Sequence, residues 1–209
     1  SLRRGMASAA KKLPYFKGKN FLIKCAERPA DYFLGQALVF PESEAQHILK
    51  PAYQHGKAAH ELAAPIYDRV KNADEVTQKQ YLDMNMWLPG DILLKADKMC
   101  MAHSLELRVP FLDKKVMEFA ETIPTRYRIK GTDTKIVMRA AANKTLPDAW
   151  ANRPKKGFPV PIRYWLREEK YYNLVKEYFT SDYAAIFFDT DALMQLLDDH
   201  FHEKAQNQR

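Results

Sequence analysis

Residues 91–103 read DILLKADKMCMAH, and their hydrophobic spacing indicates a helix. At about 100° per residue the apolar side chains share one broad face and extend around the far side. Only a narrow stripe that contains Asp91, Lys95 and Lys98 stays polar. A helix that is apolar over most of its circumference is expected to be buried. The segment therefore predicts a buried helix within a mainly α fold.

Helical periodicity continues on both sides of this segment. Proline and glycine residues elsewhere in the chain predict a break at Pro89-Gly90 and a proline-rich loop over 147–161. Alternation typical of strands is confined to residues 38–40 and 105–110. The other helices are expected over residues 5–13, 41–49, 60–70, 77–87, 113–122, 134–143, 162–176 and 191–204.

Charge is distributed unevenly along the 209 residues. The 33 Lys and Arg exceed the 26 Asp and Glu by seven, and residues 1–24 carry seven cations and no acid. The rest of the chain is therefore neutral, and the basic character belongs to one tract. A hydrophobic content of 46% suits one domain, or one and a part, with a real core. We expect an irregular basic segment over 1–40 and a helical body over 41–209.

Several classes of protein are disfavoured by the composition. No apolar run approaches the roughly 18–20 residues of a membrane helix, and residues 1–24 lack the apolar core of a secretory signal. Two cysteines 75 positions apart fit a reducing compartment, so a soluble, cytoplasmic protein without a membrane partner is expected. The seven glycines are never closer than 13 positions, which excludes a glycine-rich phosphate loop. Most of any nucleotide site must therefore come from residues outside these 209.

The charged residues of segment 91–103 allow two interpretations. Asp91 and Lys95 stand in the favourable i, i+4 order and can pair with each other, or they can face a partner or a site. Asp97 lies among apolar positions and needs a cation, for which Arg108 is the candidate. His103, on the apolar face, is expected in the core, and no metal-ligand spacing surrounds it.

Residues 105–113 read LELRVPFLD and predict a fixed turn. Pro110 favours extended backbone before it, so Glu106 and Arg108 project on the same side. Asp113 stands at the N-cap position of the next helix. An ion pair and a cap that lock the turn are the structural interpretation, and a catalytic role is the alternative.

The loop RPKKGFPVP at residues 153–161 is the best candidate for contact with an anion. Proline restricts its backbone, and Lys155 offers a point charge for phosphate. A solvated basic loop is the alternative. Between Asp148 and Glu168 the sequence places no acid and five cations: Arg153, Lys155, Lys156, Arg163 and Arg167.

The basic tract over residues 1–24 also has two interpretations. Aromatic residues at Tyr15, Phe16 and Phe21 lie between its cations, as in an arm that binds nucleic acid. The tract can equally be a linker whose balancing acids lie elsewhere. No folded nucleic-acid module follows it, so a nucleic-acid partner is not expected.

Residues 90–113, GDILLKADKMCMAHSLELRVPFLD, resemble the synthetase domain of glutamine-hydrolysing asparagine synthetases. That family has a basic-Ala-acidic-basic run and then Ser/Gly-Leu-Glu-x-Arg-Val-Pro-Phe-Leu-Asp. Residues 135–146 followed by RPKKGF are similar to the family's next landmark, and residues 3–21 are similar to a basic connector in bacterial members. The resemblance covers essentially the whole chain.

The resemblance implies a fold and a place within it. The chain would be the helical C-terminal portion of an α/β ATP-pyrophosphatase-type (adenine nucleotide α-hydrolase-like) synthetase domain, with 1–40 as connector and 41–209 as the helical part. The family's glutaminase domain, its Ser-Gly-Gly-x-Asp-Ser loop and its Gly-Ala-Asp-Glu-Leu-Phe-Gly-Gly-Tyr-like motif do not occur in this sequence. We therefore expect a fragment that lacks the nucleotide-binding sheet and those partner domains.

The implied enzyme is a ligase that makes asparagine. Mg-ATP adenylates the side-chain carboxylate of aspartate and releases pyrophosphate, and ammonia from glutamine attacks the β-aspartyl-AMP to give asparagine and AMP. The fragment alone is expected to be inactive and to bind neither cofactor nor metal. Two alternatives remain: a fragment of a β-lactam-synthetase-like enzyme that also adenylates a carboxylate, or a non-enzymatic helical module that binds RNA.

The resemblance also assigns site residues. Lys155 matches the catalytic lysine of the family's Arg-x-Lys loop, which contacts pyrophosphate. Lys95 matches a basic residue of the ATP and aspartate site. Family members place an acid three residues before that position, where this chain has Ile92; Asp91, four before, shares the helix face and is the candidate to replace it.

Four further positions match the family as residues that shape the site rather than react. They are Asp97, Glu106, Arg108 and Asp113.

Overall fold

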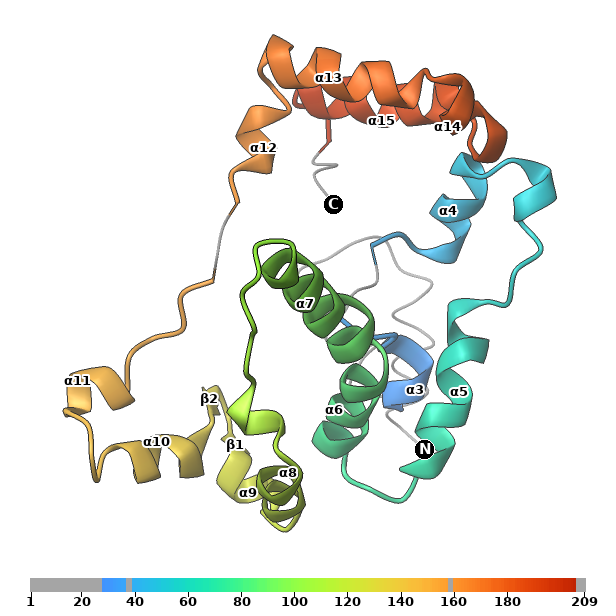
Figure 1. Ribbon diagram of the computed structural model, residues 1–209. Helices are drawn as coiled ribbons and strands as arrows, with labels where there is room; N and C mark the ends of the chain where they lie inside the picture. Colours follow the sequence, from blue (N-terminus) through green and yellow to red (C-terminus); the bar gives the residue numbers. More distant parts are fainter. Residues whose placement is uncertain (1–27, 37–38, 158–159, 206–209) are drawn as a thin grey trace. The chain divides into compact units, whose positions relative to one another are not determined.

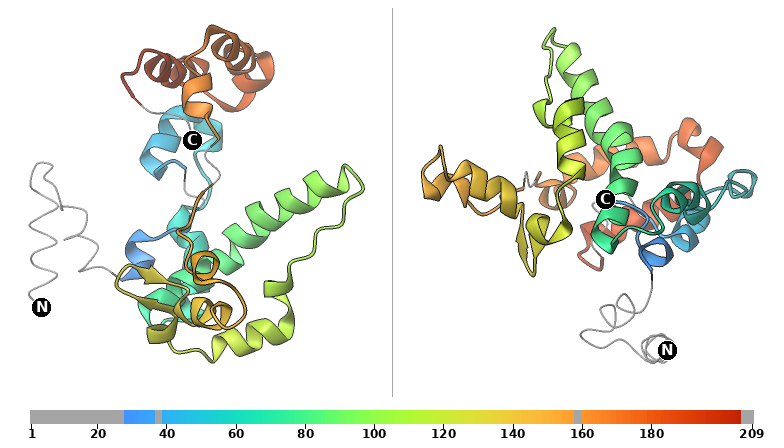
Figure 2. Two further views of the ribbon diagram at one scale, coloured as in Figure 1. Left: turned by 90° about the vertical axis from the view of Figure 1, so that its left-hand side faces the viewer. Right: turned by 90° about the horizontal axis from the view of Figure 1, so that it is seen from below.

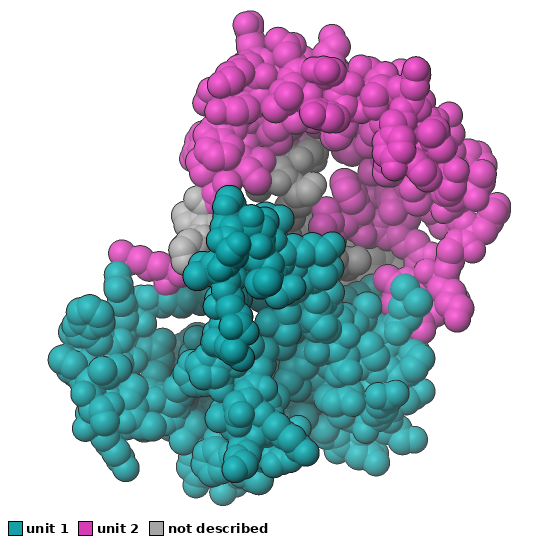
Figure 3. Space-filling model, viewed as in Figure 1, with its two compact units in different colours: residues 1–37, 62–155 teal, residues 38–61, 156–209 magenta. Residues whose placement is uncertain are grey.

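The computed structural model describes residues 28–36, 39–157 and 160–205, and this part of the chain is mainly α-helical, as predicted (Figure 1). The chain forms two compact units (Figure 3). The first unit comprises residues 1–37 and 62–155, and the second comprises 38–61 and 156–209. In the described residues no helix is long and apolar enough to cross a membrane.

The first unit contains most of the elements, and the boundary between the units falls within α5. Its elements are α3 (Pro29–Tyr32), α5 (Ala59–Arg69), α6 (Glu75–Asn85), the π-helix η2 (Leu88–Leu93), α7 (Leu94–Met101), the 3₁₀ helix η3 (Pro110–Leu112), α8 (Lys114–Glu121), α9 (Thr125–Arg128), β1 (Ile129–Lys130), β2 (Asp133–Thr134), α10 (Ile136–Ala142) and α11 (Asp148–Ala151).

The second unit contains helices alone among its described residues. They are α4 (Glu42–Ile48), the 3₁₀ helix η1 (Pro51–Tyr53), α12 (Ile162–Trp165), α13 (Glu169–Phe179), α14 (Asp182–Phe187) and α15 (Thr190–Phe201).

The core of the first unit lies where α5 and α6 meet α3. Ala63, Tyr67 and Leu82 are buried there, and partly buried side chains from α3 and the residues after it, from α5 and from the end of α6 cover them. The Tyr67 hydroxyl donates to the Phe33 carbonyl oxygen at 2.7 Å. Burial, with the charges of nearby Tyr32 and Asp83, raises the pKa of Tyr67 to about 12. The hydrogen bond lets the core contain a phenol without an unsatisfied donor.

A polar network joins α6 to α9. Asp74 caps α6 by accepting from the backbone N–H groups of Val76 and Thr77, at 3.1 and 3.2 Å. Its other carboxylate oxygen accepts from Thr125 Oγ1 at 2.8 Å. Arg128 donates to Thr77 Oγ1 at 2.7 Å. The network therefore holds the chain segment after α8 against the start of α6.

The segment expected to break at Pro89-Gly90 continues as helix instead. The π-helix η2 connects α6 to α7, so the three elements form one rod (Figure 2). The wider π turn admits Pro89 because proline has no N–H to donate and tolerates the first positions of a helical turn. The Gly90 N–H still finds an acceptor, the Met86 carbonyl oxygen, at 3.0 Å.

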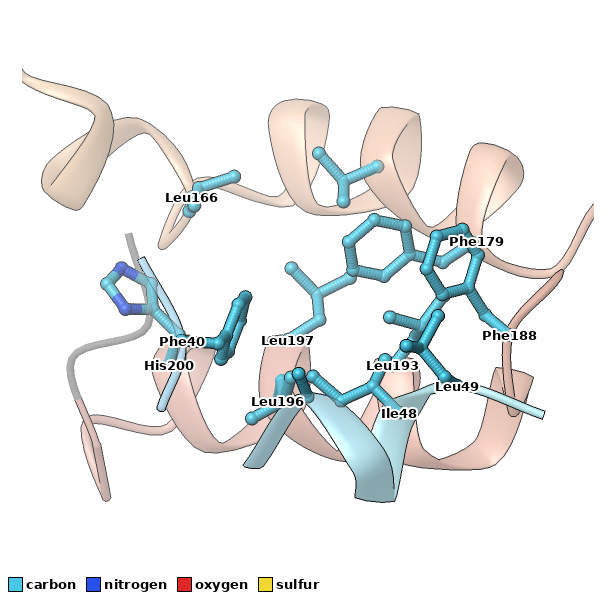
Figure 4. Close-up of a pocket in the computed structure, with 12 residues that line it drawn as sticks. Phe40, Ile48, Leu49, Leu166, Phe179, Phe188, Leu193, Leu196, Leu197 and His200 are labelled. Atoms are coloured by element: carbon cyan, nitrogen blue, oxygen red, sulfur yellow. The ribbon is translucent and has the colours of Figure 1, made fainter. Parts of the chain in front are cut away.

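The second unit is built around α13 and α15, which pack side by side (Figure 1), and α4 packs against α15. An antiparallel bridge pairs Leu49 with Phe188, and the Asp189 N–H donates to the Ile48 carbonyl oxygen at 2.8 Å. An apolar cavity of about 290 Å³ lies between these helices (Figure 4). His200 lies at the edge of this cavity and is fully buried. Its Nε2 atom is 3.0 Å from the Arg163 carbonyl oxygen.

Most predicted helices occur near their expected positions. The expectations for 41–49, 60–70, 77–87, 113–122, 134–143 and 191–204 correspond to α4, α5, α6, α8, α10 and α15. The expected helix over 162–176 is divided at Leu166 into α12 and α13. The helix expected over 5–13 lies outside the described residues, and the division at residues 40 and 41 stays a prediction.

The strand predictions were wrong where the structure describes them. Residues 105–109 form no strand and lead into η3. The hairpin that does form, β1–β2, pairs Ile129 with Thr134 and Lys130 with Asp133. Gly131 in its turn has φ of +59°, a conformation that glycine adopts without strain. Two-residue strands are too short to show alternation in a sequence, so pattern analysis missed them.

Candidate functional site

Asp91 and Lys95 lie where η2 passes into α7. Asp91 Oδ1 accepts from Lys95 Nζ at 3.1 Å, and Asp91 Oδ2 accepts from the Trp87 indole N–H at 3.0 Å. The internal pair, one of the two interpretations of the spacing, is therefore formed. The Lys95 side chain is 62% exposed and that of Asp91 44%. The indole orients the carboxylate, while the lysine stays accessible to a negatively charged ligand.

Glu106 and Arg108 form the expected ion pair, with 2.7 Å between Oε1 and Nη2. Asp97 is exposed on α7. The described residues show no ion pair between Asp97 and Arg108, so that expected contact is not formed. Glu106 and Arg108 are two residues apart in the segment between α7 and η3, so the pair joins near neighbours in the sequence.

Asp113 caps α8, as predicted. Its Oδ1 accepts from the backbone N–H groups of Lys115 and Val116, at 2.9 and 3.4 Å. The cap satisfies donors that the first helical turn leaves free. Because Asp113 directly follows η3, the cap fixes where η3 ends and α8 begins.

The loop that carries Lys155 leaves the end of α11. Residues 152–157 are exposed, and Lys155 is among them. Arg139 of α10 holds the start of this loop: its Nη1 donates to the carbonyl oxygens of Ala151 and Arg153, at 3.1 and 3.3 Å. Its Nε donates to the Thr134 carbonyl oxygen at 3.2 Å.

Arg139 did not emerge as a site residue from the sequence. The only signal is that it is the one charged residue of the α10 segment IVMRAAA. Its acceptors are backbone carbonyl groups, which every residue has, so no residue pattern marks them.

The structure thus joins the candidate residues in pairs rather than in one cluster. In the described part of the chain, no hydrogen bond or ion pair connects Lys155 to Asp91, Lys95 or Arg108. Nor do the described histidine, cysteine and acidic residues form a group of three that could hold a metal ion.

Much of the surface next to Asp91 and Lys95 is apolar. The predicted burial of segment 91–103 was wrong for this structure: α7 contains no buried residue, and His103 is exposed rather than in the core. Several apolar side chains of α7, among them Leu94, Met99 and Met101, are exposed. Exposed apolar residues continue from it through η3 and α8; they include Leu94, Met99, Met101, Leu105, Leu107, Val109, Phe111, Val116 and Phe119, the last 68% exposed.

Comparison with known proteins identifies one family. The model of the asparagine synthase family matches residues 8–209. No solved structure matches the chain. Neither of the alternatives, a β-lactam-synthetase-like enzyme or an RNA-binding module, is favoured by these comparisons.

Two bacterial relatives agree with the family match. The chain is 39% identical over 196 residues to glutamine-hydrolysing asparagine synthetase 1 of Bacillus subtilis strain 168, an alignment that covers 92% of this chain and 30% of the relative. It is 37% identical over 200 residues to a putative glutamine-hydrolysing asparagine synthetase of Mycobacterium tuberculosis H37Rv, covering 95% and 30%. The chain thus spans about 30% of the length of these relatives, and it belongs to the asparagine synthase family.

Proposed function

We propose that the chain is the helical part of a glutamine-hydrolysing asparagine synthetase, a ligase that converts aspartate to asparagine at the expense of ATP. The observation that carries the proposal is the family match over residues 8–209. The names of the two bacterial relatives support the same substrates: aspartate, ATP and glutamine as the source of ammonia.

The nucleotide would bind mainly outside this chain. The widely spaced glycines offer no phosphate loop, and the described residues offer no magnesium ligand set. We therefore propose an α/β ATP-pyrophosphatase-type domain whose nucleotide-binding sheet lies in another part of the enzyme. When bound, Mg-ATP supplies the adenylyl group that activates the aspartate carboxylate for attack by ammonia.

The exposed apolar surface of α7, η3 and α8 supports this arrangement. Exposed apolar patches beyond a few hundred Å² usually mark contact surfaces, and Met99, Phe111 and Phe119 are each more than 60% exposed. We propose that the nucleotide-binding part covers this surface. The Glu106–Arg108 pair and the Asp113 cap would then shape the site by holding the segment between α7 and α8, and exposed Asp97 of α7 would also help to shape it.

Lys155 would act on the leaving group. Adenylation of aspartate breaks the bond between the α- and β-phosphates, and negative charge develops on the departing pyrophosphate. An ammonium group within contact distance stabilises that charge more in the transition state than in the ground state. Lys155 suits this role because it is exposed. It also follows by two residues Arg153, whose carbonyl oxygen accepts a hydrogen bond from Arg139.

Lys95 would contribute a second positive charge to the site. Asp91 keeps its ammonium group in place at 3.1 Å, and the exposed pair can exchange this contact for one with a substrate carboxylate or phosphate. An exposed ion pair costs little to rearrange, since its net contribution is about 0–1 kcal/mol.

The test uses the full-length synthetase with ATP, aspartate and glutamine. Wild type should form asparagine, AMP and pyrophosphate in equal amounts. Lys155→Ala should lower the rate on the order of 10²-fold, as expected when one charge-stabilising donor is removed. Lys144→Ala, an exposed lysine that follows α10, serves as the matched control and should retain wild-type activity. A Lys155→Ala enzyme with a near-normal rate would remove this residue from the site.

A further inference from the structure

We propose that Arg139 is a positioning residue that sets the place of Lys155 by clamping the backbone before it. The inference rests on the proposed function of Lys155, but the clamp itself is a feature of the first unit. Three main-chain carbonyl groups from separate segments converge on this one guanidinium: Thr134 at the end of β2, Ala151 at the end of α11, and Arg153 in the loop.

The geometry suits an arginine specifically. Nη1 carries two hydrogens and uses them on two carbonyl oxygens, at 3.1 and 3.3 Å, while Nε uses its hydrogen on a third at 3.2 Å. A planar fork with donors in fixed directions can bridge acceptors on different sides, whereas an ammonium group is a compact point charge. The bond to Ala151 is partly buried, so solvent competes less for it, whereas the bonds to Thr134 and Arg153 are exposed.

The clamp leaves the loop little freedom up to Lys155. The carbonyl group of Arg153 belongs to the peptide plane that precedes Pro154, so fixing this oxygen also orients that plane. The proline ring restricts the next torsion, φ, to about −65°. One soft torsion, the ψ of Pro154, then remains before the Cα of Lys155 is reached. A side chain in α10 thereby restricts where the lysine of the loop can lie.

A second contact holds the same loop start. Asn152 Nδ2 donates to Asn143 Oδ1 at 3.3 Å and to Asp148 Oδ1 at 2.5 Å, which ties the end of α10 to α11. This contact fixes α11 but reaches no carbonyl group beyond Asn152. Arg139 is therefore the described side chain whose hydrogen bonds extend to within two residues of Lys155.

The first experiment measures the order of the loop without reference to activity. Trypsin should cleave after Lys155 and Lys156 faster in Arg139→Ala than in wild type, because the loop start is released. Arg126→Ala is the control, since Arg126 lies over the neighbouring Tyr127 ring, 4.8 Å from its centroid, in the same unit. Equal cleavage rates for Arg139→Ala and wild type would overturn the clamp. Arg139→Lys, which keeps the charge, should resemble Arg139→Ala; full rescue by lysine would equally contradict a role for the fork.

The second experiment connects the clamp to Lys155 in the full-length enzyme. Arg139→Ala should lower the kcat of aspartate-dependent exchange between pyrophosphate and ATP on the order of 10²-fold, as displacement of a catalytic group does, with the KM for aspartate unchanged. In a Lys155→Ala background the same substitution should have little further effect, because Arg139 acts through that lysine. Multiplicative losses in the double variant would show that Arg139 acts by another route.

The two experiments separate the possible failures. If Lys155→Ala alone leaves the exchange unchanged, the proposed role of Lys155 fails, and the trypsin result still decides whether Arg139 orders the loop.

Discussion

At the scale of single residues, local hydrogen bonds to the backbone define where several helices begin. Asp113 is an example, since it accepts two backbone N–H groups at the start of α8. Asp113→Ala should weaken the first turn of α8 by about 1 kcal/mol, the usual cost of losing an aspartate cap. Amide hydrogen exchange in α8 should then accelerate about fivefold. Lys115→Ala in the same helix should leave the exchange rates near those of wild type; equal rates in the Asp113 variant would exclude the cap.

Single residues also show what a sequence can and cannot predict. The cap at Asp113, the Asp91–Lys95 pair and the Glu106–Arg108 pair were predictable because each joins residues two to four positions apart. Arg139 was not, because two of its acceptors lie 12 and 14 residues away and are main-chain oxygens. Spacing rules apply to near neighbours, whereas this clamp depends on how α10 and α11 pack.

Between elements, the network around Asp74 predicts a dependence of stability on pH. Partial burial opposes ionisation of Asp74, but hydrogen bonds from Thr77 and Thr125 and the charge of Arg128 outweigh it, so its pKa lies below the ordinary aspartate value. The stabilisation is complete above the unfolded-state pKa of about 4 and is lost as the pH falls through the lower folded-state pKa.

Asp74→Asn tests this dependence. At pH 7 the variant should unfold at a lower temperature than wild type, because the charge that Arg128 faces, 3.6 Å away, is gone. The difference in Tm should shrink as the pH falls below about 4, where wild type loses the same charge. Asp68→Asn, at an exposed position of α5, should show no such trend. A difference that stays constant from pH 7 to pH 2 would contradict a role for ionised Asp74.

The elements themselves were predictable to different degrees. Amphipathic periodicity located α5, α6, α8 and α15 within a few residues. It failed at Pro89-Gly90, because a π turn accommodates a proline and a glycine that normally end a helix. It also predicted that α7 is buried, which is wrong. Apolar sides bury a helix only where another element covers them. The apolar pattern of α7 indicates that another surface covers this helix, but it does not identify that surface.

For the whole molecule, the central claim is that this chain completes the site of an aspartate-activating synthetase. The most direct measurement is the exchange of labelled pyrophosphate into ATP, which occurs only if an enzyme forms the aspartyl adenylate reversibly. We predict aspartate-dependent exchange by the full-length enzyme and none by the 209-residue chain alone, since the chain lacks a glycine-rich phosphate loop. Exchange by the 209 residues alone, or a full-length enzyme without aspartate-dependent exchange, would contradict the account.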